Sequence, residues 1–128
     1  MTKFIIDAYA WIEYLNGSER GKRVAEFVEQ SEHEIYTSAA TVAEVISKFL
    51  RTNKDPHIAI TAINSMSMVV TLTQELSSEA AHIHFEAKKK VKNFGMLDAF
   101  VGATAKKLGA KILTGADDFK YFKEVVWV

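Results

Sequence analysis

Short apolar runs alternate with longer helical stripes along the chain, and this alternation restricts the fold more than any other feature of the sequence. The runs with strand character are Lys3–Ile6, Glu34–Tyr36, Met68–Leu72, Lys111–Thr114 and Val125–Val128. The segments with helical spacing are Ala8–Leu15, Glu19–Gln30, Ser38 or Thr41 to about Arg51, a helix that begins at Asp55-Pro56, Ser77–Asn93 and Asp98–Leu108. Strands separated by helices need crossover connections. The pattern therefore predicts an α/β fold, with a mainly parallel central sheet of four to five short strands flanked by helices.

Size and composition limit the classes of protein that the chain can be. It has 128 residues, 48% of them hydrophobic, and no cysteine. We expect a single domain over residues 1–128, and the lack of cysteine excludes disulfides and thiolate metal sites. Sixteen basic residues balance sixteen acidic ones, which argues against a protein that coats nucleic acid by charge alone. Because no run resembles a signal peptide or a membrane span, we expect a cytoplasmic protein.

Acidic residues follow two of the expected strands. In an open parallel sheet, sites form beyond the carboxyl ends of the strands. Asp7 comes directly after the first strand, and Asp117 and Asp118 follow the fourth strand after two residues. Asp98 stands at the head of the last long helix, where the helix dipole favours a carboxylate. Helix capping by Asp7 and Asp98, and a turn at Asp117-Asp118, are the alternatives, and the residues alone leave them open.

Glu44 lies on the helix that ends near Arg51. The apolar stripe of that helix consists of Val42, Val45, Ile46, Phe49 and Leu50. At 100° per residue, Glu44 falls on the opposite face. It either points to solvent, paired with Lys48 four residues on, or points into a cleft. Periodicity does not decide between these two alternatives.

Carboxylates that meet in one place favour a bound cation. Such groups repel one another and raise one another's pKa values unless a positive charge neutralises them. Mg²⁺ and Mn²⁺ prefer oxygen ligands and keep several waters for chemistry. An ion of this kind can activate a water and stabilise charge on a phosphate. If the acids converge, they predict a metal site suited to phosphodiester hydrolysis.

Four stretches of the chain carry a further signal. They are Phe4–Ile12, Thr37–Val45, Gly95–Ala105 and Lys111–Phe119. In this order they resemble the PIN-domain ribonucleases, and most closely the VapC-type toxins. The resemblance implies a PIN-like fold and an endoribonuclease that hydrolyses RNA at a carboxylate-bound Mg²⁺ or Mn²⁺. It also implies that Asp7, Glu44 and Asp98 are the metal-site acids, which selects the cleft-facing alternative for Glu44.

The fourth acid departs from the family pattern. The family usually has Thr-x-Asp-x-x-Phe here, whereas this chain has Ala116 at the acidic position. We predict that Asp117 replaces it as a catalytic and metal-binding residue, with Asp118 or no acid as the alternatives. In the implied mechanism Asp7 and Asp98 anchor the ion, and Glu44 binds it through water or orients the attacking water.

The resemblance also implies partners. These are an RNA substrate, a second copy of the chain in a homodimer, and a cognate antitoxin that lies across the cleft. Apolar side chains of the early helices, among them Trp11, either pack in the core or form the antitoxin's docking surface. A PIN-domain RNA-processing nuclease without antitoxin is one alternative. A catalytically degenerate PIN-like binding module is another, and Ala116 keeps it open.

Two basic clusters and one pair of histidines have both structural and functional interpretations. Lys88, Lys89, Lys90 and Lys92 form the densest basic cluster. They form a solvated face or contact the phosphate backbone of a nucleic acid, and Arg20, Lys22 and Arg23 are a weaker second set. His82 and His84 lie two residues apart on a helix, so they face different directions, and we expect surface residues rather than ligands.

Overall fold

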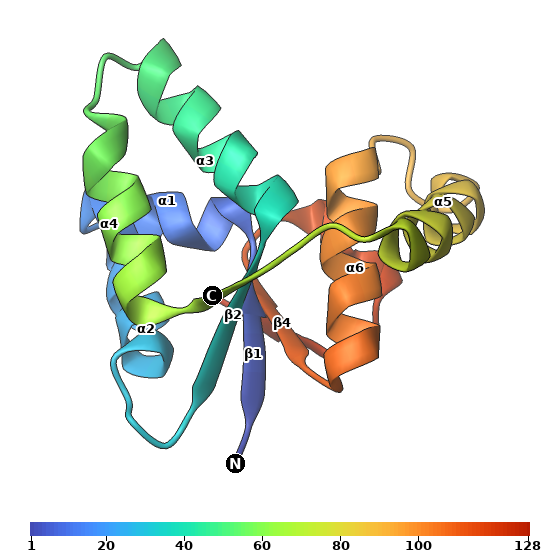
Figure 1. The fold of residues 1–128 in the computed structure, drawn as a ribbon, viewed down its shortest axis with the longest axis horizontal. Coiled ribbons are helices and arrows are strands. Elements are labelled where there is room, and N and C mark those ends of the chain that lie inside the picture. The colour runs from blue at the N-terminus through green and yellow to red at the C-terminus, as the bar shows by residue number, and fades with distance from the viewer.

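The computed structural model describes residues 1–128 and contains a single five-stranded sheet (Figure 1). The strands are β1 (Lys3–Ile6), β2 (Glu34–Ser38), β3 (Met68–Val70), β4 (Lys111–Thr114) and β5 (Val125–Trp127). They lie in the order β3-β2-β1-β4-β5, and every neighbouring pair is parallel. The prediction of an α/β fold with a mainly parallel sheet is therefore confirmed.

Six α-helices and one 3₁₀ helix connect the strands. They are α1 (Ala8–Asn16), α2 (Glu19–Val28), α3 (Ala39–Arg51), α4 (Pro56–Met66), α5 (Gln74–Lys88), α6 (Met96–Leu108) and η1 (Asp117–Tyr121). Polar side chains at Asp7, Ser18, Ser38, Asp55 and Thr73 cap the first five of them. None of the helices combines the length and the apolar character that crossing a membrane requires.

The bounds predicted for α5 are wrong. The apolar spacing suggests Ser77–Asn93, but the helix spans Gln74–Lys88. It starts earlier because the hydroxyl of Thr73 accepts a backbone N–H of the first turn at 3.1 Å. Val91 and Phe94, which extend the apolar spacing beyond the helix, are buried in a loop. Burial of a loop can therefore imitate helical periodicity.

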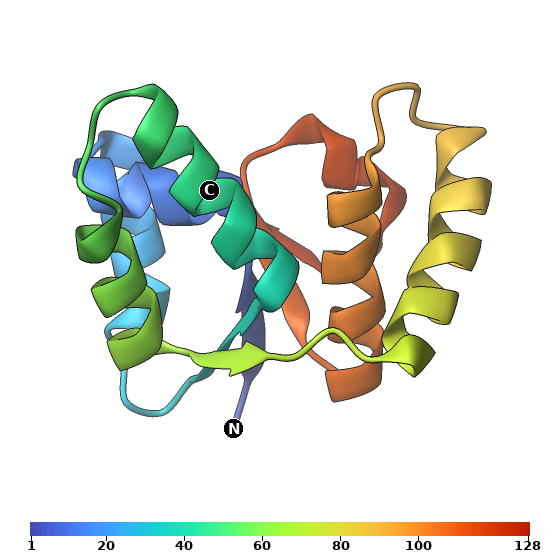
Figure 2. The same ribbon diagram turned by 45° about the horizontal axis from the view of Figure 1, so that its top comes forward.

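Helices cover both faces of the sheet. Figures 1 and 2 show α1 to α4 on one side, and α5, α6 and η1 on the other. Successive side chains of β1 point to opposite faces of the sheet, as the pleat of a strand requires, so they pack against different layers of helices. Phe4 and Ile6 pack with Trp11 in the core under α1 to α4, and Ile5 packs with Val101 in the core under α6.

Trp11 fixes α1 on the sheet. Its side chain is fully buried, and its Nε1–H donates to Oγ1 of Thr37 in β2 at 3.0 Å. The Oγ1 atom of Thr37 also lies 2.7 Å from Oγ of Ser67. Of the two alternatives for Trp11, core packing is correct, so this side chain is not part of an exposed docking surface.

The carboxyl ends of the strands meet at one edge of the sheet because all the strands are parallel. Ile6 pairs with Leu113, so Asp7 and Thr114 lie next to each other where β1 and β4 end. α1 begins one residue after β1, and α3 begins directly after β2. This edge therefore gathers the ends of β1, β2 and β4 and the first turns of two helices, which is where sites form in open α/β sheets.

Candidate active site

Asp7 lies between β1 and α1 and is only 3% exposed. Its Oδ1 accepts the N–H of Ala10 at 2.8 Å, so the side chain caps α1. Its Oδ2 accepts the hydroxyl hydrogen of Thr114 from β4. A carboxylate oxygen has about two lone-pair positions, so each keeps about one for another partner. The capping alternative is therefore correct for one oxygen, and it does not prevent the carboxylate from binding a ligand.

Two other acids lie near enough to Asp7 to influence its pKa. Burial raises this pKa from 3.8 to about 7. The hydrogen bonds from Thr114 and Ala10 lower it, and the charges of Asp98 and Glu44 raise it. These two acids are distant in the chain, so the fold has brought three carboxylates from separate segments near one another.

The turn after β4 holds Thr114 in position. Its Oγ1 accepts the N–H of Ala116 at 2.9 Å, which leaves its hydroxyl hydrogen for Asp7. A Cβ on Gly115 would lie 2.4 Å from the ring of Tyr9, so only glycine lets the turn approach α1 this closely. Thr114 is thus a positioning residue for Asp7, and the sequence analysis missed it. The sequence did contain a signal for this role, since Thr114 is a hydroxyl residue at the end of a predicted strand and lies three residues before Asp117.

Asp98 is the third residue of α6, and its Oδ2 accepts the N–H of Gly95, the N-cap residue, at 3.0 Å. Burial raises its pKa, the hydrogen bond from Gly95 lowers it, the charge of Asp118 raises it and that of His84 lowers it. His84 is half-buried and its ring lies 6.3 Å from that of Phe94. His82 is exposed and His84 keeps part of its surface exposed, so both remain surface residues, and His84 is the one whose charge reaches Asp98.

Glu44 points into a groove between α1 and α3. The groove has a volume of about 640 Å³, and Leu97 of α6 also lines it. Glu44 is half-buried and forms no ion pair with Lys48. Burial, and to a lesser extent the charge of Asp98, raise its pKa to about 7. Of the two alternatives for Glu44, the cleft-facing one agrees with this geometry.

The two acids of η1 point in different directions. Neighbouring residues of a 3₁₀ helix are separated by about 120°. Asp117 is exposed and Asp118 is half-buried. Of these two acids, only Asp118 has a charge that raises the pKa of Asp98. This placement favours Asp118 over Asp117 as the replacement for the acid that Ala116 displaces.

The acids at this edge have little positive charge of the protein to balance them. None of Asp7, Glu44, Asp98 and Asp118 takes part in an ion pair. No three His, Asp or Glu side chains are arranged closely enough, as they stand, to hold a metal ion. Their chemistry nevertheless suits a hard divalent cation, since carboxylate oxygens are its preferred ligands and its charge would relieve the repulsion. The metal site stays a prediction.

Two variants with the same chemical change test the fourth acid. Asp118→Asn is expected to weaken Mn²⁺ binding by about 10–100-fold, the usual effect of a group that supports a metal site. Asp117→Asn removes the same charge one residue away and is expected to leave the affinity within about two-fold, since the side chain is exposed. Titration calorimetry with Mn²⁺ measures both. If only Asp117→Asn loses affinity for Mn²⁺, the assignment of Asp118 as the fourth acid is contradicted.

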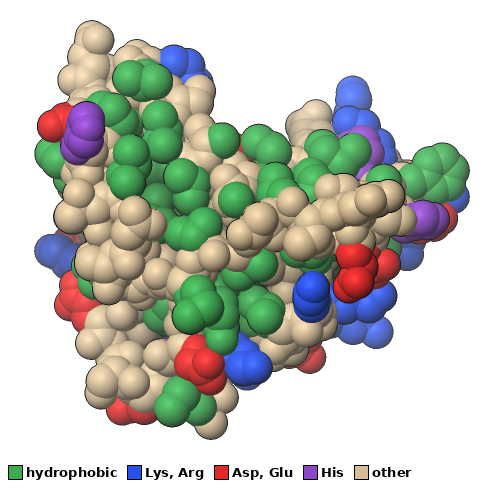
Figure 3. Space-filling view, in the orientation of Figure 1, with side chains coloured by type: hydrophobic (Ala, Val, Ile, Leu, Met, Phe, Trp, Pro, Cys, Tyr) green, Lys and Arg blue, Asp and Glu red, His purple; other side chains and the backbone are tan.

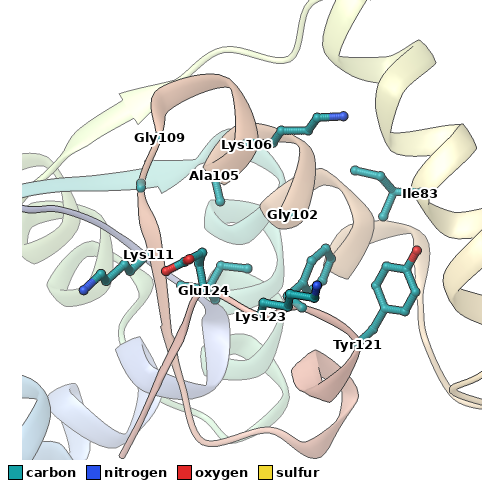
Figure 4. Close-up of a pocket in the computed structure, with 12 residues that line it drawn as sticks. Ile83, Gly102, Ala105, Lys106, Gly109, Lys111, Tyr121, Lys123 and Glu124 are labelled. Atoms are coloured by element: carbon teal, nitrogen blue, oxygen red, sulfur yellow. The ribbon is translucent and has the colours of Figure 1, made fainter.

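A second and more apolar hollow lies elsewhere (Figure 4). It has a volume of about 710 Å³ and is lined by α5, α6, the start of β4 and the segment before β5. Gly102 is required beneath it, because a Cβ there would lie 2.2 Å from the ring of Phe122. Lys106 is one of its lining residues, and its Nζ lies 2.7 Å from Oε1 of Glu79. None of the four acids lines this hollow, so it is separate from the candidate site.

Comparison with known proteins extends these observations. The model of the PIN domain family matches residues 4–125 of the chain. No curated protein matches the sequence significantly.

Several solved structures share the fold. VapC20 of Mycobacterium tuberculosis, a toxin that cleaves the sarcin-ricin loop, superposes with a TM-score of 0.72 at 18% identity, over 95% of this chain and 98% of its own. VapBC2 of Rickettsia felis, solved with a DNA fragment from its promoter, has a TM-score of 0.75 at 12% identity, over 99% and 98% of the two chains. VapBC-1 of nontypeable Haemophilus influenzae has a TM-score of 0.68 at 19% identity, over 99% and 97%. At these identities the likeness establishes a common fold.

Proposed function

This chain belongs to the PIN domain family, and on that premise we propose that it is a metal-dependent endoribonuclease and the toxin of a VapBC-type toxin–antitoxin pair. The observation that supports the proposal is that three acids from separate segments lie near enough to influence one another: the charges of Asp98 and Glu44 raise the pKa of Asp7, and that of Asp98 raises the pKa of Glu44, with burial as the larger cause in both. Buried and half-buried acids that lie near one another and form no ion pair are suited to holding a divalent ion beside a phosphodiester.

In the proposed mechanism, Asp7 and Asp98 would hold Mg²⁺ or Mn²⁺, with Asp118 as a further ligand. When bound, the ion supplies positive charge for the phosphate oxygens and makes a water more acidic. Two hydrogen bonds hold Asp7 and one holds Asp98, so both carboxylates keep their orientation during the reaction. Glu44 lies on the groove side of the acids, where its Oε atoms would orient the attacking water and accept its proton.

The activity itself is the test of this proposal. The purified protein is expected to cleave a mixed pool of single-stranded RNA with Mg²⁺ or Mn²⁺, to stop when EDTA is added, and to resume when the metal is restored. Asp98→Asn is expected to be inactive, because the amide retains an acceptor for the N–H of Gly95 but loses the charge. The exposed Asp117→Asn is the control and should remain active. Cleavage that persists in EDTA, or in Asp98→Asn, contradicts the mechanism.

A cognate antitoxin, a homodimer and a cytoplasmic location complete the proposal. The support for the antitoxin is that the structural relatives include VapBC assemblies. The exposed apolar side chains on this half of the molecule belong to α3 and α4 rather than to the first helix: Leu50 and Ile58 are 60% and 59% exposed. Figure 3 shows apolar side chains gathered over these two helices. Relief of a toxin-induced growth arrest by a small neighbouring open reading frame would separate the toxin role from RNA processing.

A catalytically degenerate binding module is the second candidate function. The observation in its favour is Ala116, which stands where the family usually has its fourth acid. RNA binding without cleavage in the presence of Mg²⁺ or Mn²⁺ would establish it.

A further inference from the structure

The groove between α1 and α3, called here the α1–α3 groove, leads away from the acids and changes charge along its length. Glu44 lines the part nearest Asp98. Lys48 and Arg51 line the part beyond it. The groove therefore connects the candidate site to a positively charged surface of α3.

The three charged groove residues of α3, which are Glu44, Lys48 and Arg51, lie on one face of that helix. Lys48 and Arg51 follow Glu44 by four and seven residues, a spacing that stacks side chains along a helix. At a rise of about 1.5 Å per residue, their backbones lie about 6 and about 10 Å beyond Glu44 along the axis. Just past the helix, the ammonium group of Lys54 donates to Oδ1 of Asn16 and extends the positive charge. A basic stripe thus begins one helical turn from the acids.

This positive charge has no partner within the chain. Lys48 and Arg51 are exposed and form no ion pair. The other acid of the groove, Glu13, accepts the hydroxyl hydrogen of Ser18 at 3.1 Å rather than binding a basic side chain. An anionic ligand that reaches the acids would therefore meet free cations as it continued along the groove.

We propose that the α1–α3 groove binds the sugar–phosphate backbone of single-stranded RNA, with Lys48 and Arg51 contacting the phosphates next to the one that is cleaved. The inference rests on the proposed nuclease function. Arg51 can bind phosphate oxygens through two parallel hydrogen bonds, and Lys48 acts as a compact charge. A positively charged groove that follows the backbone is a general way to hold a single strand. It also explains how a chain with balanced charge binds a polyanion.

The lysine cluster at the end of α5 fits this role less well. Lys89 lies 3.4 Å from Glu86, and Lys88 donates to the backbone oxygen of Phe94 at 3.5 Å. No residue of that cluster lines the groove that contains Glu44. The stripe on α3 is therefore the better match to a strand that ends at the acids.

The double variant Lys48→Ala/Arg51→Ala tests the inference through substrate binding. For cleavage of a single-stranded RNA oligonucleotide, its KM is expected to rise about ten-fold or more, with kcat at saturating RNA within about three-fold. The dependence of log(kcat/KM) on log[salt] should become shallower by about 1.4, because each phosphate contact on a single strand contributes about 0.7. Lys111→Ala/Lys123→Ala removes the same charge beside the hollow of Figure 4 and should change both quantities much less.

The outcomes separate the groove from the nuclease proposal. If the wild-type protein cleaves RNA and the two double variants have equal KM values and salt slopes, the groove inference fails and the nuclease proposal stands. If the wild-type protein does not cleave, the nuclease proposal fails. The affinity of each variant for the same RNA, measured by fluorescence anisotropy, then tests whether the groove binds RNA. Weaker RNA binding only in the groove variant supports the inference, and equal binding overturns it. An acidic peptide is the alternative anionic ligand of the groove. If Lys48→Ala/Arg51→Ala loses binding to such a peptide but binds RNA as the wild type does, the inference is also overturned.

Discussion

Asp7→Asn is expected to abolish RNA cleavage and, at the same time, to raise the melting temperature of the metal-free protein at pH 8. Asp7 is 3% exposed and has a pKa of about 7, mainly because of burial, so keeping it charged at pH 8 destabilises the fold. Asparagine retains an acceptor for the N–H of Ala10 and can donate to Thr114. It loses the charge that would hold the metal, and a rate decrease of about 10³-fold or more is expected.

Asp55 provides the matched control for this experiment. It also caps a helix, since its Oδ1 accepts the N–H of His57 at 2.9 Å. It is exposed, however, and the hydrogen bonds from the backbone and side chain of His57 lower its pKa. Asp55→Asn is therefore expected to leave cleavage unchanged and not to raise the melting temperature. Retained cleavage in Asp7→Asn, or melting several degrees below the wild type, contradicts the role given to Asp7.

The metal-free protein is expected to lose stability as the pH rises from about 4 to about 8. The pKa values of Asp7 and Glu44 are raised from 3.8 and 4.5 to about 7. A raised pKa means that the folded state holds the proton more tightly than the unfolded chain does. Its stabilisation is complete below about pH 4 and is lost as the pH rises through about 7. For the buried Asp7 this amounts to at most about 4 kcal/mol.

Mn²⁺ is expected to reverse this loss. The ion binds ionised carboxylates and displaces their protons, so its stabilising effect should grow with pH. Thermal melts at several pH values, with and without Mn²⁺, measure both effects. The difference between wild type and Asp7→Asn isolates Asp7, because the other titrating groups are common to both proteins. A difference that does not change with pH contradicts the raised pKa, and equal stabilisation by Mn²⁺ at pH 5 and pH 8 contradicts binding at the acids.

The same acidic side chain can cap a helix and bind a metal ion, and Asp7 and Asp98 are placed to do both. Asp7 caps α1, and Asp98 accepts a hydrogen bond from the N-cap residue of α6. Both carboxylates thus lie at helix N-termini, whose partial positive charge favours anions. The two helix ends offset part of the repulsion among the acids, and the N–H donors fix the orientation of the side chains. In the proposed metal site, the same contacts that begin the helices would therefore orient the ligands.

The strands could be predicted best where the chain itself marks their ends. Lys3–Ile6 and Lys111–Thr114 match the structure residue for residue, because apolar runs are closed by Asp7 and Gly115. The end of α5 could not be predicted in this way. Val91 and Phe94 continue its apolar spacing but pack from a loop, and the sequence does not distinguish these two arrangements.

The candidate site depends more strongly on contacts between distant segments. Periodicity places Glu44 on the face of α3 opposite its apolar stripe, but only the packing of α1 beside α3 turns that face into a groove wall. Asp117 and Asp118 are neighbours in the chain, and the turn of η1 alone determines which one faces Asp98. The family resemblance predicts that Glu44 faces the cleft. It does not predict which residue replaces the fourth acid, because Ala116 occupies that position, and only the structure distinguishes Asp117 from Asp118.

A crystal soaked in Mn²⁺ and measured by anomalous scattering tests the central claim most directly. The account predicts an anomalous peak at the carboxyl edge of the sheet, about 2.1 Å from carboxylate oxygens of both Asp7 and Asp98. Glu44 should approach that peak directly or through water. A saturating soak that leaves this edge without a peak, or places the ion on other residues, would contradict the assignment of these acids as a metal centre.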